Sequence, residues 1–139
     1  MKIALFPNLT RKKSLSVAKD VCRQLETLGT EYYISNEQKD SFPDCAAKFV
    51  DVAEAVKLCD VIICVGGDGT IIHSAKFGKP VLGINAGRIA FMAGLEPTEL
   101  DMLKELINGN YEIDRRMMLK ADIHSADGEI VRTSYCIND

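Results

Sequence analysis

Residues 61–72 read VIICVGGDGTII, an unbroken apolar run followed by three glycines around one aspartate. An apolar run that does not alternate with polar residues is typical of a strand covered on both faces of a parallel sheet. The glycines end this strand, and behind them we predict a short helix from Thr70 to Phe77. The stretch therefore predicts one strand–turn–helix unit of an α/β fold, with the GGDG turn at the carboxyl end of a buried strand.

The sequence on both sides continues this alternation of strands and helices. Together with the unit above, the predicted strands cover residues 2–6, 32–34, 60–65 and 80–84. The predicted helices cover residues 14–28, 45–58, 70–77 and 97–107, and a polar loop covers 36–44. This order predicts a doubly wound, mostly parallel, Rossmann-like sheet.

The last part of the chain has a different pattern. Residues 119–124 and 130–137 alternate apolar and polar side chains, and Asp-Gly at 127–128 is typical of a hairpin turn. A lone hairpin is marginal in water, so we expect it to need further strands. We therefore predict an α/β nucleotide-binding domain at residues 1–112 and the first strands of a truncated β-rich domain at 113–139.

The composition excludes several classes of function. The chain has 139 residues, 47% hydrophobic and 27% charged, as expected of one globular domain. Its net charge of −3 argues against a general nucleic-acid binder. The one basic run, residues 11–13, is either a solvated loop or a contact to a phosphate-bearing ligand.

The cysteines, the histidines and the apolar runs predict a cytoplasmic protein with no resident metal and no membrane contact. No apolar run approaches the ~20 residues that cross a bilayer, and the N-terminal run is too short for a signal peptide. The five cysteines form no CxxC pair, which favours a reducing compartment. His73 and His124 share no metal-ligand spacing.

The aspartate inside the glycine turn indicates phosphoryl transfer. Glycines and the free N–H groups of a helix start suit a phosphate, whereas a carboxylate repels one. Asp68 is therefore either a general base on a hydroxyl or a group that meets phosphate through a divalent cation. The structural alternative is a tight turn in which Asp68 caps the helix. The turn fits neither GxxxxGK(S/T) nor GxGxxG.

A second candidate segment, GINAGRIAFM at residues 83–92, leaves the predicted sheet at the same edge. Asn85 can hydrogen-bond polar atoms of a ligand. Phe91 either stacks on a base or lies in the core, and Arg88 is either a cation for phosphate or a surface residue.

Four segments together resemble one known family. GGDGT at residues 66–70 resembles the GGDG(T/N) signature of NAD kinases, which diacylglycerol kinases, sphingosine kinases and 6-phosphofructokinases share more loosely. PVLGINAGRIAFM at residues 80–92 resembles the NAD-kinase stretch PVLGINxGxLGFL. RRMML at residues 115–119 resembles the entry into that family's β domain, and Asn-Asp at 138–139 falls at its Asn-Glu/Asp pair.

The resemblance implies roles for the matching residues. Asp68 would accept the proton from the 2′-hydroxyl of NAD's adenosine ribose. The residues implied to shape the phosphate loop are Gly66, Gly67, Gly69 and Thr70. The residues implied to bind NAD are Asp68, Gly69, His73, Phe91, Asn138 and Asp139. For His73 the alternative of a helix residue that covers the sheet stays open. Ala90 and Met92 replace the family's usual Gly and Leu, which leaves Phe91 in place.

The resemblance also implies a reaction, in which ATP or inorganic polyphosphate, with a divalent metal such as Mg²⁺, phosphorylates NAD to NADP. It implies a β-sandwich after the α/β domain and a homodimer or homotetramer, and we expect the 139 residues alone to be inactive. Two alternatives stay open: a lipid or sugar kinase with the same loop, and a non-catalytic nucleotide-binding module. The first predicts no requirement for Phe91 and no NADP product. The second predicts NAD binding without turnover, with affinity and behaviour nearly unchanged by Asp68→Asn.

Overall fold

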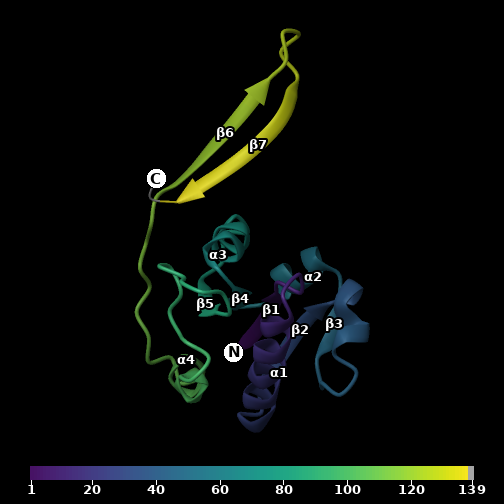
Figure 1. Cartoon of the computed structure of the whole chain (residues 1–139), viewed down its shortest axis with the longest axis vertical. Helices are drawn as coiled ribbons and strands as arrows, with labels where there is room; N and C mark the ends of the chain where they lie inside the picture. Colours follow the sequence, from purple (N-terminus) through teal and green to yellow (C-terminus); the bar gives the residue numbers. More distant parts are fainter. Residues whose placement is uncertain (138–139) are drawn as a thin grey trace.

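A computed structural model describes residues 1–137, and Asn138 and Asp139 lie outside the described residues. Within residues 1–137, five strands form one parallel sheet in the order β3-β2-β1-β4-β5, and two further strands form an antiparallel pair (Figure 1). The strands of the parallel sheet are β1 (Lys2–Pro7), β2 (Glu31–Ser35), β3 (Lys48–Val50), β4 (Val61–Gly66) and β5 (Val81–Asn85). This architecture confirms the predicted α/β, Rossmann-like fold.

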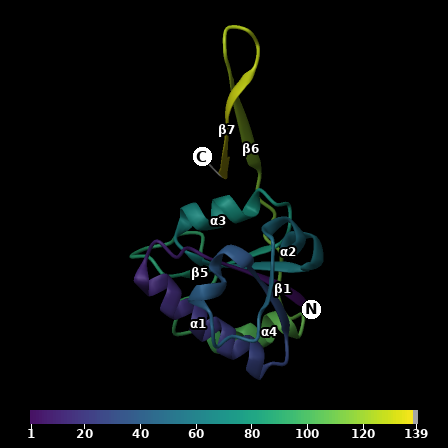
Figure 2. The same cartoon turned by 90° about the vertical axis from the view of Figure 1, so that its right-hand side faces the viewer.

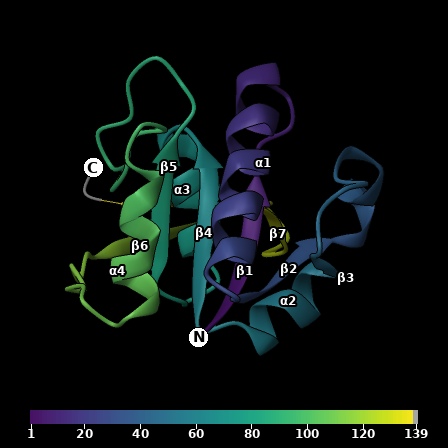
Figure 3. The ribbon, with the colours of Figure 1, turned by 90° about the horizontal axis from the view of Figure 1, so that it is seen from below.

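Helices cover both faces of the parallel sheet (Figure 3). The helices are α1 (Lys12–Thr27), α2 (Val52–Leu58), α3 (Asp68–Ala75) and α4 (Leu103–Ile107), with 3-10 turns η1 (Asn36–Ser41), inside the predicted loop, and η2 (Leu100–Met102). Ile63 of β4 belongs to the hydrophobic cluster under α1 and α4, whereas its neighbour Ile62 belongs to the cluster under α2. Successive side chains of a strand point to opposite faces, so β4 needs an apolar residue at every position.

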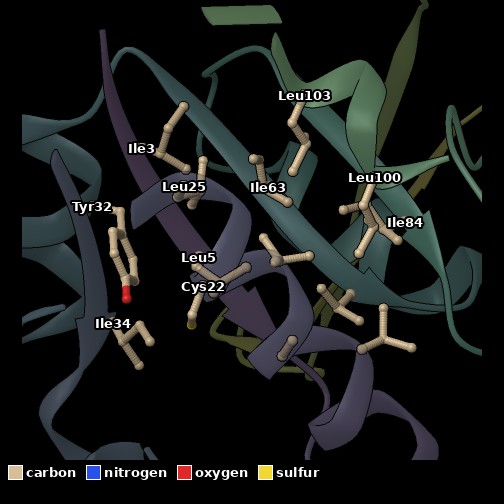
Figure 4. Packing of buried hydrophobic residues seen from close by; sticks show 14 of the residues in the cluster. Ile3, Leu5, Cys22, Leu25, Tyr32, Ile34, Ile63, Ile84, Leu100 and Leu103 are labelled. Carbon is tan, nitrogen blue, oxygen red and sulfur yellow. The ribbon is translucent and has the colours of Figure 1, made fainter. Parts of the chain in front are cut away.

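The larger cluster is the main source of stability for the sheet. Cys22 and Leu25 of α1 lie against Ile3 and Leu5 of β1 and Ile63 of β4 (Figure 4), and all five side chains are 0% exposed. Burial of one large aliphatic side chain contributes about 1.5–3 kcal/mol. This packing fixes the strands whose carboxyl ends carry the candidate site.

The predicted helix over residues 45–58 is wrong in its first half. Lys48–Val50 forms β3 instead and pairs in parallel with β2. The helix begins only after Asp51, whose Oδ1 accepts a 2.8 Å hydrogen bond from the backbone N–H of Glu54. A three-residue strand followed directly by a capped helix produces an apolar spacing that resembles one longer helix. The helix predicted from residue 97 also starts late, with η2 at Leu100.

The strand order reverses beside β1. β1 leads through α1 to β2 on one side, whereas β4 leads through α3 to β5 on the other. Ligands of open α/β sheets bind beyond the carboxyl ends of the strands at such a reversal. Here those ends are Pro7 of β1 and Gly66 of β4, and the register pairs Pro7 with Val65.

The strands β6 (Met118–His124) and β7 (Ile130–Ile137) form a hairpin that extends beyond α3, away from the parallel sheet (Figures 1 and 2). Leu119 is 50% exposed and Val131 63% exposed, so the described residues give most of the hairpin no core. Between α4 and β6 the described chain has no regular element, and the predicted boundary after residue 112 falls there. Of the helices in residues 1–137, none has both the length and the apolar character needed to cross a membrane.

Candidate functional site

The GGDG turn joins β4 directly to α3. β4 ends at Gly66, Gly67 is the N-cap, and α3 begins at Asp68, two residues earlier than the predicted start at Thr70. A Cβ on Gly66 would lie 2.3 Å from Thr70 Oγ1, so only glycine allows the helix to start this close to the strand. The first N–H groups of an eight-residue helix therefore face the carboxyl edge of the sheet.

The carboxylate of Asp68 is held by two backbone N–H groups from another loop. Its Oδ1 accepts a 2.9 Å bond from Met92 N–H, and its Oδ2 accepts a 3.2 Å bond from Phe91 N–H. Gly67, not Asp68, occupies the N-cap position, so the alternative in which Asp68 caps the helix is wrong. Asp68 is half-buried, and both of its carboxylate oxygens are oriented by backbone hydrogen bonds.

The loop over residues 86–94 carries Phe91 at the surface. The Phe91 side chain is 88% exposed, so within the described residues it lies outside the core of the parallel sheet. Arg88 in the same loop is also exposed. Because the backbone N–H of Phe91 donates to Asp68, the exposed Phe91 ring lies close enough to share a ligand with that carboxylate.

Asn85 differs from the expectation that it contacts a ligand. It is the last residue of β5 and only 5% exposed. Its Nδ2 donates to Oε1 and Oε2 of Glu96 at 2.9 and 3.2 Å, and its Oδ1 accepts a 2.8 Å bond from Gly87 N–H. Both the nitrogen and the oxygen of the Asn85 side chain therefore already have hydrogen-bond partners within the chain.

A pocket of about 420 Å³ lies on the other side of α3, at the carboxyl ends of β1 and β2. Its lining is made by residues of both strands, η1, α2 and α3: Phe6, Pro7, Asn8, Ser35, Gln38, Val52, Gly69, Thr70, His73, Ser74 and Phe77. Phe6 and Phe77 meet edge to face, with ring centroids 5.8 Å apart. Lining of this kind, apolar rings with a few polar groups, is typical of small-molecule sites.

His73 lies in this pocket, which Asp68 does not line. Its ring is edge-on to Phe77 at 6.2 Å, and its Nδ1 is 3.3 Å from the Lys76 ammonium nitrogen. Burial, and then the charge of Lys76, lower the pKa of His73 below its ordinary value. His73 is therefore a neutral hydrogen-bonding group at pH 7 rather than a cation.

The remaining chemistry-bearing groups near the turn are few. Burial raises the pKa of Cys64 in β4 to about 12, so this thiol is protonated at neutral pH and is no nucleophile. No three His, Cys, Asp or Glu side chains among the described residues group as a metal site. Asp68 is thus the group at the turn that can take a proton from a substrate.

Sequence reasoning missed most of the pocket lining. Asn8 follows β1 and Ser35 ends β2, and the rule that ligands bind at the carboxyl ends of strands would have selected both. Asn138 and Asp139, predicted to bind NAD, lie outside the described residues. Ile137 before them is 8% exposed, and its strand β7 contacts α3.

The family described as "ATP-NAD kinase N-terminal domain" matches residues 3–111. An NAD kinase of Chlorobaculum tepidum is 32% identical over 130 residues, which cover 91% of this chain and 45% of the relative. An NAD kinase of Caldanaerobacter subterraneus subsp. tengcongensis is 33% identical over 94% of this chain and 47% of the relative. The chain thus spans about half the length of the curated relatives it matches.

The structure has a solved neighbour with the same fold. The crystal structure of yeast NADH kinase complexed with NADH matches 97% of this chain and 46% of that chain, with a TM-score of 0.80 and 14% sequence identity.

Proposed function

This chain belongs to the NAD kinase family, and on that premise we propose that the whole protein transfers a phosphoryl group from ATP to the 2′-hydroxyl of the adenosine ribose of NAD, giving NADP. One observation supports this most: a carboxylate, Asp68, is oriented at the carboxyl edge of the sheet beside an exposed aromatic ring. The curated relatives named as NAD kinases support the same reaction.

In this proposal Asp68 is the general base. A carboxylate has about four acceptor sites, and the two bonds from Phe91 and Met92 leave others for the ribose hydroxyl. As the 2′-oxygen attacks the terminal phosphorus of the donor, its proton passes to Asp68, and the bond to the leaving nucleoside diphosphate breaks. Phe91 would stack on the adenine of NAD, and Gly69 would contact NAD through its backbone.

The turn itself would receive the transferred phosphate. Gly66, Gly67, Gly69 and Thr70 surround the start of α3, where unpaired N–H groups and the helix dipole favour an anion. Gly67 and Gly69 have open space where a side chain would be, so a phosphate can approach the backbone closely.

The pocket beside α3 supports a nucleoside triphosphate, rather than inorganic polyphosphate, as the donor. A polyphosphate chain requires lysine and arginine side chains along its length. The lining contains neither residue and instead offers two phenylalanine rings and a neutral His73. These groups suit a base and a sugar, so we assign His73 to the donor side rather than to NAD.

A divalent cation such as Mg²⁺ fits the residues only if it arrives with the donor. Mg²⁺ is usually bound by one or two carboxylates together with substrate phosphates. The turn offers one carboxylate, and when bound the cation would neutralise charge on the phosphates. We further propose that Asn138 and Asp139 contact NAD, that the whole protein is a homo-oligomer and that it acts in the cytoplasm.

The experiment is an assay of the whole protein with NAD and either ATP or polyphosphate, with NADP as the readout. We expect NADP with ATP and much less with polyphosphate. Diacylglycerol and sphingosine are the control acceptors, because kinases of those lipids share the GGDG turn. A phosphorylated lipid without NADP would overturn the proposal in favour of a lipid kinase, and NAD binding without turnover would favour a non-catalytic module.

A further inference from the structure

The loop over residues 86–94, which carries Phe91, is closed at its base by backbone hydrogen bonds. Backbone N–H groups of Gly94 and Leu95 donate to Gly83 O at 2.9 and 3.2 Å, and Asn85 N–H donates to Leu95 O at 2.9 Å. Ile84 and Leu95 form a parallel bridge. These contacts define the neck of the loop, where the chain leaves β5 and returns.

The side chains of Asn85 and Glu96 clamp this neck. The amide nitrogen of Asn85 donates to both carboxylate oxygens of Glu96, and its amide oxygen holds Gly87 N–H at the start of the loop. Glu96 is held in turn, because its own N–H donates to Glu99 Oε2 at 2.8 Å. Hydrogen bonds to an ionised carboxylate are stronger than those between neutral groups, so the clamp resists opening.

The far end of the same loop holds the proposed base. Phe91 and Met92 donate their backbone N–H groups to the two oxygens of Asp68. The position of those N–H groups depends on the loop, and the shape of the loop depends on its neck. Asn85 ends β5 and pairs with Gly66, the last residue of the adjacent strand β4, and Ala86 N–H also donates to Gly66 O at 2.8 Å, which ties the neck to the turn.

We propose that Asn85 and Glu96 are positioning residues for the proton transfer, and this inference rests on the proposed function. They fix the 86–94 loop so that its two N–H groups hold the Asp68 carboxylate in the orientation that accepts the ribose proton. Neither residue touches a substrate. Their amide–carboxylate pair, in which Asn85 is buried and Glu96 is exposed, acts through Asp68.

Two substitutions in the whole protein separate this role from general stability. Glu96→Ala removes the carboxylate that binds Asn85, and because Glu96 is exposed the change should cost little stability. We expect kcat to fall on the order of tenfold with little change in KM for NAD, because a misplaced base slows only the chemical step. Glu96→Gln keeps an oxygen that accepts from Asn85, and we expect kcat within about threefold of the parent. The matched control is Glu105→Ala, which removes a 2.9 Å bond from Asn110 Nδ2 far from the turn and should leave kcat unchanged.

A double-mutant cycle and hydrogen exchange complete the test. If Glu96 acts through Asp68, then Glu96→Ala added to Asp68→Asn should not lower the residual rate further. Amide exchange at Phe91 and Met92 should accelerate in Glu96→Ala and not in Glu105→Ala. Because amide exchange can be measured without enzyme activity, it tests whether Glu96 holds the loop independently of the reaction.

Three results would overturn the inference: equal slowing of the parent and of Asp68→Asn by Glu96→Ala, failure of Glu96→Gln to restore kcat, or unchanged exchange at Phe91 and Met92. A rise in KM for NAD at constant kcat would also overturn it, because it would make the pair a ligand contact. The proposed function fails separately, if the parent protein makes no NADP or if Asp68→Asn retains full kcat.

Discussion

The two sides of α3 are built in opposite ways. The side facing the 86–94 loop has a carboxylate and an aromatic ring, but the ring is 88% exposed and the described residues build no wall around it. The side facing β1 and β2 has a pocket of about 420 Å³ with an aromatic pair and a neutral His73 in its lining, and the Lys76 ammonium lies 3.3 Å from His73 Nδ1. The side with the 86–94 loop therefore has a carboxylate but no enclosing pocket among the described residues. The side with β1 and β2 has a pocket but no carboxylate in its lining.

From this contrast we propose that the acceptor binds on the Asp68 side and the donor on the pocket side, with the GGDG turn between them. A chain that spans about half of its curated relatives is consistent with an acceptor side whose remaining walls come from elsewhere in the whole protein. The following variants, made in the whole protein, test the contrast from its largest expected effect to its smallest.

Asp68→Asn should lower kcat by about 10²–10⁴-fold, because an amide cannot accept the ribose proton. KM for NAD and KM for ATP should change only a few-fold, since the amide oxygen can still accept one of the loop N–H bonds. Steady-state NADP formation measures both parameters. The control is Asp101→Asn on the η2 turn, which should retain kcat; comparable losses in both variants would remove the basis for a special role of Asp68.

Gly66→Ala should destabilise the fold by about 1–3 kcal/mol, because the added Cβ would lie 2.3 Å from Thr70 Oγ1 and must displace it. Gly67→Ala is the matched control for stability, since no atom lies within 4 Å of its Cβ position, and it should cost less than about 1 kcal/mol. Urea unfolding of the two variants gives the difference. Equal stability would mean that the turn does not require the close approach of strand and helix.

Phe91→Ala should raise KM for NAD about tenfold while kcat changes little, because stacking of a base on an aromatic ring contributes about 1–3 kcal/mol. The free energy of unfolding should stay within about 0.5 kcal/mol, since the ring is 88% exposed. Kinetics with NAD as the varied substrate, together with urea unfolding, measure both. A large loss of stability with an unchanged KM would mean that the ring packs within the protein rather than on NAD.

Phe77→Leu should raise KM for ATP about threefold and leave KM for NAD unchanged, because it removes aromatic contacts worth ~0.5–1.5 kcal/mol from the pocket side only. The measurement is kinetics with ATP as the varied substrate. If KM for NAD rose instead, the pocket would bind NAD, and the assignments of donor and acceptor to the two sides of α3 would have to be exchanged.

The elements that could be predicted from the sequence are those whose pattern is local. The unbroken run of β4 predicts a buried parallel strand, and the glycines of 66–69 predict its end, because both signals lie within a few neighbouring residues. β3 was missed because three residues are too few to show a period of two, and Asp51 lies inside what looks like one helix.

The parts of the site that could not be predicted depend on contacts between distant segments. The bonds that Asp68 receives come from residues 23 and 24 positions away, and Asn85 is bound by Glu96 across the whole loop. Their spacing in the sequence carries no signal for either contact. The pocket likewise combines β1, β2 and α3, which only the strand order brings together.

A crystal structure of the whole protein with NAD bound tests the central claim most directly. The account predicts the ribose 2′-oxygen within about 2.6–3.2 Å of an Asp68 carboxylate oxygen, with the adenine against Phe91. A ribose bound instead among Phe6, His73 and Phe77, on the opposite side of α3 from that carboxylate, would contradict it.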